Sequence, residues 1–334
     1  MEFSSTRYDN MQYRRCGRSG LMLPVISLGA YETYGSYVGE DVAKACLYRA
    51  FDLGITHFDL ANNYGVPPGN AEIMVGKILK DMPRDELIIS TKAGWRMWPG
   101  PYGEWLSKKY LVASLDQSLQ RLGLDYVDIY YAHRPDPHTP LEETMEALDL
   151  IVRQGKALYI GVSSFSGAHF EEACKVVERR NLSHILIRQP SYSMLNRKIE
   201  WDLLDHTQRN GTGVITFASL GQGLLTNKYL GGRIPEDSRA GALWGEEGKS
   251  RFTPETLARV RALNEIAARR GQTLAQMAVA WVLRLPQITS VLLGASRVSQ
   301  LEENVAALAN LEFSVEELAE IDRITGDQGC NALK

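Results

Sequence analysis

Two hydrophobic patterns alternate along the chain from about residue 25 onward. Short runs rich in β-branched residues predict strands, and each is followed by a stretch with the apolar periodicity of an amphipathic helix. Strands are predicted at 25–28, 56–60, 87–91, 126–132, 158–163, 184–188, 213–217 and 290–293. Helices are predicted at 41–52, 70–80, 108–121, 141–153, 169–179, 200–209, 254–270, 274–283, 300–309 and 315–325.

This alternation predicts the α/β class, with a parallel sheet covered by helices. Eight strand–helix units can close into a (β/α)8 TIM barrel, which leaves no sheet edge exposed. An open, doubly wound sheet is the structural alternative, and it usually carries Gly-x-Gly-x-x-Gly after its first strand. The segment Ser27-Leu-Gly-Ala-Tyr31 lacks that motif, so the sequence favours the barrel.

The residues before the first barrel strand predict a separate β-hairpin. Two segments, 11–16 and 21–24, flank the turn Gly17-Arg-Ser-Gly20, and such a hairpin would close the bottom of the barrel. No linker-like or low-complexity segment divides the chain. We therefore expect residues 1–334 to form a single domain.

Composition and charge argue against several functional classes. The formal net charge of −3 gives no general reason to expect binding to nucleic acid. No apolar run approaches the roughly 20 residues of a membrane span, and the first ten residues lack the apolar core of a signal peptide. The cysteines are widely spaced, at Cys16, Cys46, Cys174 and Cys330. We therefore expect a cytoplasmic protein with reduced thiols and without nucleic-acid or membrane partners.

Chemically coherent residues gather at the carboxyl ends of the predicted strands, where barrel active sites are built. Asp59 and Lys92 end the second and third strands, His133 follows the fourth, and Tyr64 lies in the loop after Asp59. Hydride transfer to a carbonyl leaves an oxyanion that must gain a proton. Tyrosine has a free pKa of about 10, and a neighbouring lysine ammonium favours its phenolate, which eases proton donation. The four residue types therefore suit carbonyl reduction.

The other two members of this set have matching tasks. An aspartate keeps the lysine charged and in place, and a neutral histidine orients the carbonyl by donating a hydrogen bond. Singly, Asp59 and Lys92 fit a structural ion pair, and His133 fits a strand cap, but their placement on one rim favours catalysis. His57 lies on the same strand face as Asp59 but one layer deeper, so we interpret it as a hydrogen-bonded core histidine. A metal-dependent hydrolase would need clustered ligands at several strand ends, so no metal site is predicted.

At these residues the chain resembles the aldo-keto reductase superfamily, from Gly29 to Asn304. The general match rests on Gly54-Ile-Thr-His-Phe-Asp59 with Tyr64, Leu87-Ile-Ile-Ser-Thr-Lys92, Asp125-Tyr-Val-Asp-Ile-Tyr-Tyr-Ala-His133 and Gly161-Val-Ser-Ser-Phe-Ser166. Three further segments resemble the branch of potassium-channel β subunits and bacterial L-glyceraldehyde-3-phosphate reductases: Gln189–Arg197, Gly223–Tyr229 and Gly294–Asn304.

The resemblance implies a catalytic tetrad in which Tyr64 is the general acid and Lys92 tunes it. Asp59 would anchor Lys92, and His133 would orient the carbonyl. The implied cofactor is NADPH/NADP+, with its nicotinamide carboxamide held by Ser163, Ser164 and Gln189. Phe217 would stack on the nicotinamide ring, and the pyrophosphate channel would be lined by Leu220, Gly223, Lys228 and Arg239.

The adenosine end of the cofactor has a physical rationale of its own. Gly294-Ala-Ser296 lies just before a predicted helix, whose free amides and dipole favour a phosphate. Arg297 would bind a ribose 2′-phosphate bidentately, which favours NADP(H) over NAD(H). The next residues expected to reach the adenosine are Gln300, Glu303 and Asn304. Glu303 fits a solvent-exposed helix face equally well.

The chain departs from the family pattern at two places. Close relatives often carry Ser-Pro after the stacking aromatic, where this chain has Ala218-Ser219, so the shape of that loop is open. Channel subunits tend to carry asparagine at the position of His133, so the histidine favours an active reductase. The alternative function is an NADPH-binding, redox-sensing accessory subunit with slow turnover.

The loop at 94–105 is rich in aromatic residues, glycine and proline. One interpretation makes it a pocket wall, with a substrate site shaped by Tyr31, Trp95, Trp98 and Tyr102. Arg96 or Arg134 would then meet an anionic substrate. The equal alternative is a packed lid whose tryptophans never reach substrate. The resemblance adds small aldehydes or ketones as substrates, glyceraldehyde 3-phosphate and methylglyoxal among them, and a homo-oligomer, a tetramer.

Overall fold

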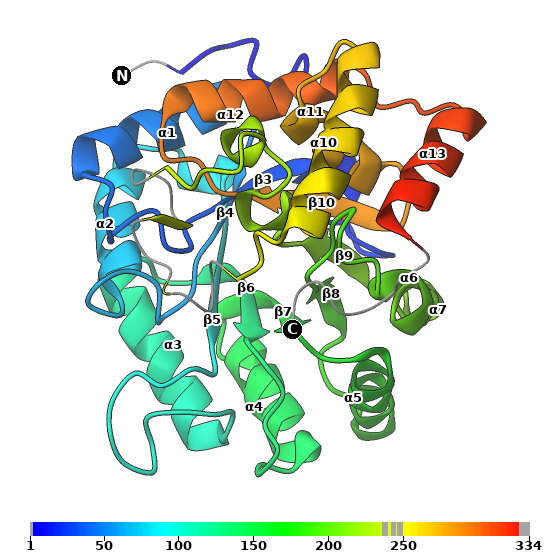
Figure 1. Ribbon diagram of the computed structural model, residues 1–334. Coiled ribbons are helices and arrows are strands. Elements are labelled where there is room, and N and C mark those ends of the chain that lie inside the picture. Colours follow the sequence, from blue (N-terminus) through cyan, green and yellow to red (C-terminus); the bar gives the residue numbers. More distant parts are fainter. Residues whose placement is uncertain (1–2, 236–239, 242–244, 246–249, 327–334) are drawn as a thin grey trace.

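Eight parallel strands form a closed barrel in the computed structural model, which describes residues 3–235, 240–241, 245 and 250–326 (Figure 1). The strands are β3 (Ile26–Gly29), β4 (His57–Asp59), β5 (Ile88–Ala93), β6 (Val127–Ala132), β7 (Ala157–Ser163), β8 (Ile185–Gln189), β9 (Gly213–Thr216) and β10 (Ile288–Leu293). The last strand, β10, pairs with β3, which closes the sheet. The predicted (β/α)8 barrel is confirmed, and each predicted strand end lies within about two residues of the observed one.

Helices cover the outside of the barrel (Figure 1). They are α1 (Glu40–Asp52), α2 (Asn70–Leu79), α3 (Lys108–Leu122), α4 (Leu141–Arg153), α5 (Gly167–Arg180), α6 (Ile199–Asp202), α7 (Leu204–Asn210), α10 (Pro254–Arg269), α11 (Leu274–Leu283), α12 (Val298–Val305) and α13 (Val315–Thr325). Short 3₁₀ helices are η1 (Arg84–Glu86), η2 (Gly221–Gly223), η3 (Asn227–Tyr229) and η4 (Ala306–Ala309). The single helix predicted at 200–209 is in fact two, because Leu203 has φ −129° and ψ −42°, outside helical geometry.

Polar side chains define where several helices begin. A side-chain oxygen accepts a hydrogen bond from a backbone N–H of the first turn at Ser107, Ser166, Thr253, Thr273 and Ser314. Because Ser166 is the cap of α5, that helix starts at Gly167, two residues before the predicted start. Among the helices of the described ranges, none combines the length and apolarity needed to span a membrane.

The predicted hairpin closes the bottom of the barrel. Strands β1 (Tyr13–Arg15) and β2 (Met22–Pro24) pair in antiparallel register. Cys16 and Leu23 are fully buried and pack in one cluster with Tyr131 of β6. This packing lies at the amino ends of the strands, so the opposite rim is left for a binding site.

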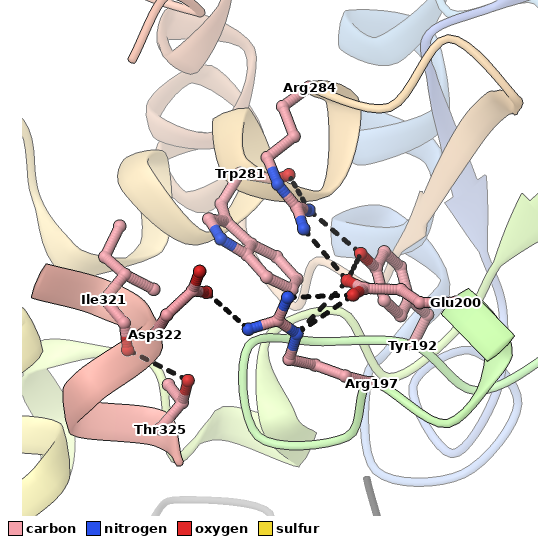
Figure 2. Close-up of polar contacts among 8 residues, drawn as sticks. All are labelled: Tyr192, Arg197, Glu200, Trp281, Arg284, Ile321, Asp322 and Thr325. Carbon is pink, nitrogen blue, oxygen red and sulfur yellow. Dashed lines mark hydrogen bonds and ion pairs between the residues drawn. The ribbon is translucent and has the colours of Figure 1, made fainter. Parts of the chain in front are cut away.

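The chain after β8 is held by a network of charges centred on Glu200 of α6 (Figure 2). The Glu200 carboxylate accepts hydrogen bonds from Tyr192 Oη (2.5 Å), Arg197 Nη2 (2.8 Å) and Arg284 Nη2 (2.9 Å). The backbone N–H of Tyr192 donates to the carbonyl of Phe217 (3.1 Å). The network therefore fixes the backbone beside Phe217, at the carboxyl end of β9.

Two further contacts connect this network to the C-terminal helices. The indole ring of Trp281 on α11 lies 3.6 Å from the Arg284 guanidinium and 5.3 Å from that of Arg197. Arg197 also pairs with Asp322 of α13 at 2.5 Å (Figure 2). Elements distant in the sequence are thus joined by one cluster of charged and aromatic groups.

We expect the Glu200→Ala variant to lose about 2–4 kcal/mol of unfolding free energy, because two part-buried guanidinium groups lose their shared carboxylate. Urea unfolding followed by circular dichroism measures the change. The matched control is Glu302→Ala, which breaks the exposed Arg49–Glu302 pair (2.8 Å) and should change stability little. Equal losses in the two variants would contradict this assignment.

Candidate active site

Asp59, Lys92 and Tyr64 meet at the carboxyl rim of the barrel. Asp59 ends β4 and Lys92 lies near the end of β5, so parallel pairing places both side chains at one end. Lys92 Nζ lies 2.5 Å from Asp59 Oδ2 and donates to the Leu60 carbonyl at 2.6 Å. The same nitrogen lies 3.4 Å from the Tyr64 hydroxyl. The lysine therefore bridges the carboxylate and the phenol.

The second oxygen of Asp59 is also fully engaged. Asp59 Oδ1 accepts hydrogen bonds from Ser90 Oγ (2.6 Å) and Gln189 Nε2 (3.3 Å). Asp59 is 1% exposed and Lys92 is 0% exposed, so the pair is held away from water. Burial lowers the pKa of Lys92, and the charge of Asp59 opposes that effect.

Tyr64 is held as a protonated phenol. Burial raises its pKa well above the usual value of about 10, and the charge of Asp59 acts in the same direction. At neutral pH the hydroxyl therefore carries its proton, as a general acid must before it reacts. The Lys92 ammonium, 3.4 Å away, is placed to stabilise the phenolate formed after proton donation.

His133 completes this group as a neutral imidazole. Burial lowers its pKa well below 6.5, and the positive charges of Lys92 and Arg134 act in the same direction. Its ring meets the Tyr64 ring edge-on, with centroids 5.8 Å apart. A neutral imidazole carries one N–H, which can donate to an oxygen bound beside Tyr64.

His57 lies one layer deeper, as the sequence predicts. Its Nδ1 is 2.9 Å from Ser27 Oγ, and its Nε2 is 2.9 Å from Ser90 Oγ. Because Ser90 also donates to Asp59, this core histidine belongs to the hydrogen-bonded layer below the site. The interpretation of His57 as a hydrogen-bonded core residue is confirmed.

A cavity of about 750 Å³ opens above these residues. Tyr64 and His133 contribute to its wall, and so does the start of α12. The residues predicted for cofactor binding that line it are Ser163, Ser164, Gln189, Phe217, Leu220, Gly223, Lys228, Gly294, Ser296, Arg297, Gln300, Glu303 and Asn304. Arg239, predicted for the same channel, lies outside the described residues.

The part of the cavity wall formed at the start of α12 is polar and includes an exposed arginine. Ser296 N and Oγ lie 3.0 and 3.1 Å from Gln300 Oε1, which ties the residues before α12 to its first turn. Arg297 precedes α12 and presents an exposed side chain to the cavity. Backbone amides at a helix start, together with a guanidinium, form an arrangement suited to a phosphate group.

The predicted substrate residues divide into two sets. Tyr31 and Trp95 line the cavity, and the Tyr31 ring lies 5.0 Å from the Tyr64 ring. Trp98 packs instead against Tyr110, with ring centroids 5.5 Å apart. The two interpretations of the loop at 94–105, a pocket wall and a packed lid, therefore each describe part of it.

Arg134 is held within the protein instead of lining the cavity. Its guanidinium lies between the rings of Trp95 (3.8 Å) and Trp105 (3.9 Å). It also pairs with Glu104 at 2.5 Å and donates to the Gly94 carbonyl at 3.1 Å. These contacts stabilise the position of Trp95. Arg96, the other arginine predicted to meet an anionic substrate, has an exposed side chain.

Other residues of the wall escaped the sequence analysis. They include Thr33, Tyr37, Asn63, Gln222, Thr226, Asn227, Tyr229, Ala275 and Leu292. Asn63 stands directly before Tyr64, so its place in the rim loop was a usable signal. Within the segment Gly223–Tyr229 the resemblance assigned only Gly223 and Lys228. Because residues 222–229 carry no helix or strand period, no local pattern indicated that Thr226, Asn227 and Tyr229 also line the wall.

Comparison with known proteins gives one consistent family. A sequence model of the Aldo/keto reductase family matches residues 25–325. L-glyceraldehyde 3-phosphate reductases of Escherichia coli O157:H7 and of strain K12 are 54% and 53% identical, each over 335 residues. These alignments cover 97% of this chain and 95% of each relative. A probable voltage-gated potassium channel subunit beta of Oryza sativa subsp. japonica is 38% identical over 302 residues, covering 89% of this chain and 91% of the relative.

We expect the free energy of unfolding to decrease as the pH is lowered, because His57 is buried in the folded chain. Burial lowers its pKa to about 4 in the folded chain, against about 6.5 in the unfolded chain. The unfolded state binds more protons between these values, so stability is complete above pH 6.5 and falls as the pH drops towards 4, by about 3 kcal/mol for this group. Urea unfolding at pH 7 and 4.5 measures the change. His57→Asn should reduce the dependence by the contribution of this one group, while the buried His133 keeps its own, and exposed His138→Asn should leave the dependence intact.

Proposed function

The chain belongs to the aldo/keto reductase family, and on that premise we propose that it reduces small aldehydes or ketones to alcohols with NADPH, using Tyr64 as the general acid. The family assignment makes it an oxidoreductase, and aldo/keto reductases generally use NAD(P)H. The observation that carries the proposal is the position of Lys92 Nζ between Asp59 and the Tyr64 hydroxyl, beside the cavity.

The chemistry of the cavity wall supports the proposal that a dinucleotide binds there. Its wall includes the Tyr64 hydroxyl and the exposed guanidinium of Arg297, and Phe217 contributes an aromatic ring. We assign the nicotinamide carboxamide to Ser163, Ser164 and Gln189, and the 2′-phosphate to Arg297. When bound, NADPH supplies a hydride to the substrate carbonyl carbon.

The side chains at the rim then have defined tasks. The neutral imidazole of His133 donates a hydrogen bond to the carbonyl oxygen and orients it. Tyr64 gives its proton to that oxygen as negative charge develops there. Lys92 stabilises the resulting phenolate, and Asp59 holds Lys92 charged and in position. Tyr31 and Trp95 cover this end of the cavity with aromatic surface.

The names of the relatives suggest a substrate. Because the Escherichia coli relatives are L-glyceraldehyde 3-phosphate reductases, we propose a phosphorylated triose aldehyde, with methylglyoxal as a second small carbonyl. Arg134 is engaged with Glu104 and two indole rings, and Arg96 is exposed but is not part of the cavity wall, so neither predicted arginine is assigned to an anionic substrate group. A redox-sensing accessory role, suggested by the channel β relatives, requires NADPH binding without fast turnover.

We expect Tyr64→Phe to lower kcat for glyceraldehyde 3-phosphate by about 10²–10⁴-fold, because the general acid is lost. The Kd for NADPH should stay within about twofold of wild type, since the variant keeps the ring. Absorbance of NADPH follows turnover, with NADH as a comparison. Tyr13→Phe removes a tyrosine hydroxyl outside the cavity, the one that donates to the Gly54 carbonyl (2.6 Å), and serves as the control. Undiminished turnover in Tyr64→Phe would contradict the mechanism. If the wild-type protein binds NADPH but does not turn over any aldehyde, the accessory role is favoured.

Single replacements of Trp95 and Trp98 test which part of the loop at 94–105 lines the cavity and which part packs inside the protein. Trp95→Ala should change kcat/KM unequally across aldehydes of different size, because Trp95 lines the cavity. Trp98→Ala should lower the melting temperature and leave the ratios of kcat/KM between aldehydes unchanged, because Trp98 packs on Tyr110. A change of aldehyde preference in Trp98→Ala alone would reverse the assignment.

A further inference from the structure

Arg188 is a charged residue buried on the outer face of the barrel wall. Side chains alternate along β8, and Gln189 faces the barrel interior, where its amide meets Asp59. Arg188 therefore points outward, beneath the helices that follow β7 and β8, and it is 4% exposed. A guanidinium is seldom buried to this degree unless it is paired.

The guanidinium is bound by backbone carbonyls. Nη1 donates to the Gln189 carbonyl at 2.6 Å, and Nη2 donates to the Phe165 carbonyl. Nε has no hydrogen-bond partner among the described residues. Asp202 acts on this charge electrostatically, but its carboxylate accepts a hydrogen bond from the Gly167 N–H at 3.0 Å. Burial lowers the pKa of Arg188 to about 9, so the group stays charged at neutral pH.

The two carbonyls belong to the two segments that we assign to the nicotinamide carboxamide. The Gln189 carbonyl also accepts hydrogen bonds from Ser163 Oγ (3.1 Å) and the Ser164 N–H (3.2 Å). Ser164 has a left-handed φ of 60°, which a non-glycine residue adopts only where its surroundings enforce it. Arg188 thus ties the end of β8 to the loop after β7 at the point where that loop is strained.

We propose that Arg188 is a positioning residue for the nicotinamide half of the cofactor. By joining the carbonyls of Phe165 and Gln189, it holds the side chains of Ser163, Ser164 and Gln189 at one fixed separation. We assign the adenosine half to the cavity residues at the start of α12, and Arg188 donates to none of them. This inference rests on the proposed NADPH-dependent function.

The test compares two ligands on three variants by isothermal titration calorimetry. NADPH spans both halves of the site, and adenosine 2′,5′-bisphosphate occupies only the adenosine half. Arg188→Met removes both hydrogen bonds while keeping a long side chain, and Arg188→Lys keeps the charge and part of the donor capacity. Arg14→Met is the matched control, because Arg14 also binds backbone carbonyls, those of Leu283 (2.9 Å) and Ile288 (2.7 Å), at the bottom of the barrel.

We expect Arg188→Met to raise the Kd for NADPH about tenfold, and to leave the Kd for adenosine 2′,5′-bisphosphate within about twofold of wild type. Arg188→Lys should recover part of the NADPH affinity. Arg14→Met should lower the melting temperature and change neither Kd. A stability effect alone would not separate the two ligands, so their ratio identifies positioning.

Other outcomes overturn the inference. Unchanged NADPH affinity in Arg188→Met would remove any positioning role, and equal weakening of both ligands would indicate a purely structural one. If Arg188→Met does not fold, Arg188→Lys decides by the same ratio of the two Kd values. If the wild-type protein binds adenosine 2′,5′-bisphosphate but no NADPH, both the proposed function and this inference are overturned. If the wild-type protein binds NADPH normally and the Arg188 variants do not behave as expected, only the inference about Arg188 is overturned.

Discussion

Pairing of β10 with β3 closes the sheet, and the arrangement of the site follows from that closure. In a closed parallel barrel, alternate side chains of each strand must face the interior, and every strand must end at the same rim. Asp59, Lys92 and Gln189 come from three strands, yet all three meet in one hydrogen-bonded group. The hairpin fills the opposite end, so the cavity opens at the carboxyl rim alone within the described part of the chain.

The closed barrel also sets the cost of the charges placed in it. A buried charge needs a partner or several hydrogen bonds to offset its lost hydration. Lys92 pairs with Asp59 and donates a hydrogen bond to the Leu60 carbonyl. The buried carboxylate of Glu72, which accepts a hydrogen bond from Thr91, pairs with Arg121 at 2.7 Å. Arg188 has carbonyls instead of a carboxylate, so its charge contributes to the geometry of the backbone around it.

Aromatic residues around the rim have separate tasks that their shared chemistry does not reveal. Trp95 lines the cavity while its other face packs on Arg134, so one ring is both wall and support. Trp98 and Trp281 pack inside the protein, the first on Tyr110 and the second on the arginines of the Glu200 network. Cavity lining and structural packing are thus divided among chemically identical side chains.

The sequence by itself determined the strand order, the hairpin, the barrel and the choice of Asp59, Tyr64, Lys92 and His133 as a group. These follow from local periodicity and from the position of polar residues at strand ends, which a barrel brings together. Only the tertiary structure decided that Arg134 is enclosed, that Trp98 turns away from the cavity, and that Arg188 joins two loops. Gly94 and Glu104 lie 40 and 30 residues from Arg134, and Phe165 lies 23 residues from Arg188, so no local pattern records these contacts. Whether such a side chain faces a ligand or a neighbour depends on which long-range partner satisfies its charge.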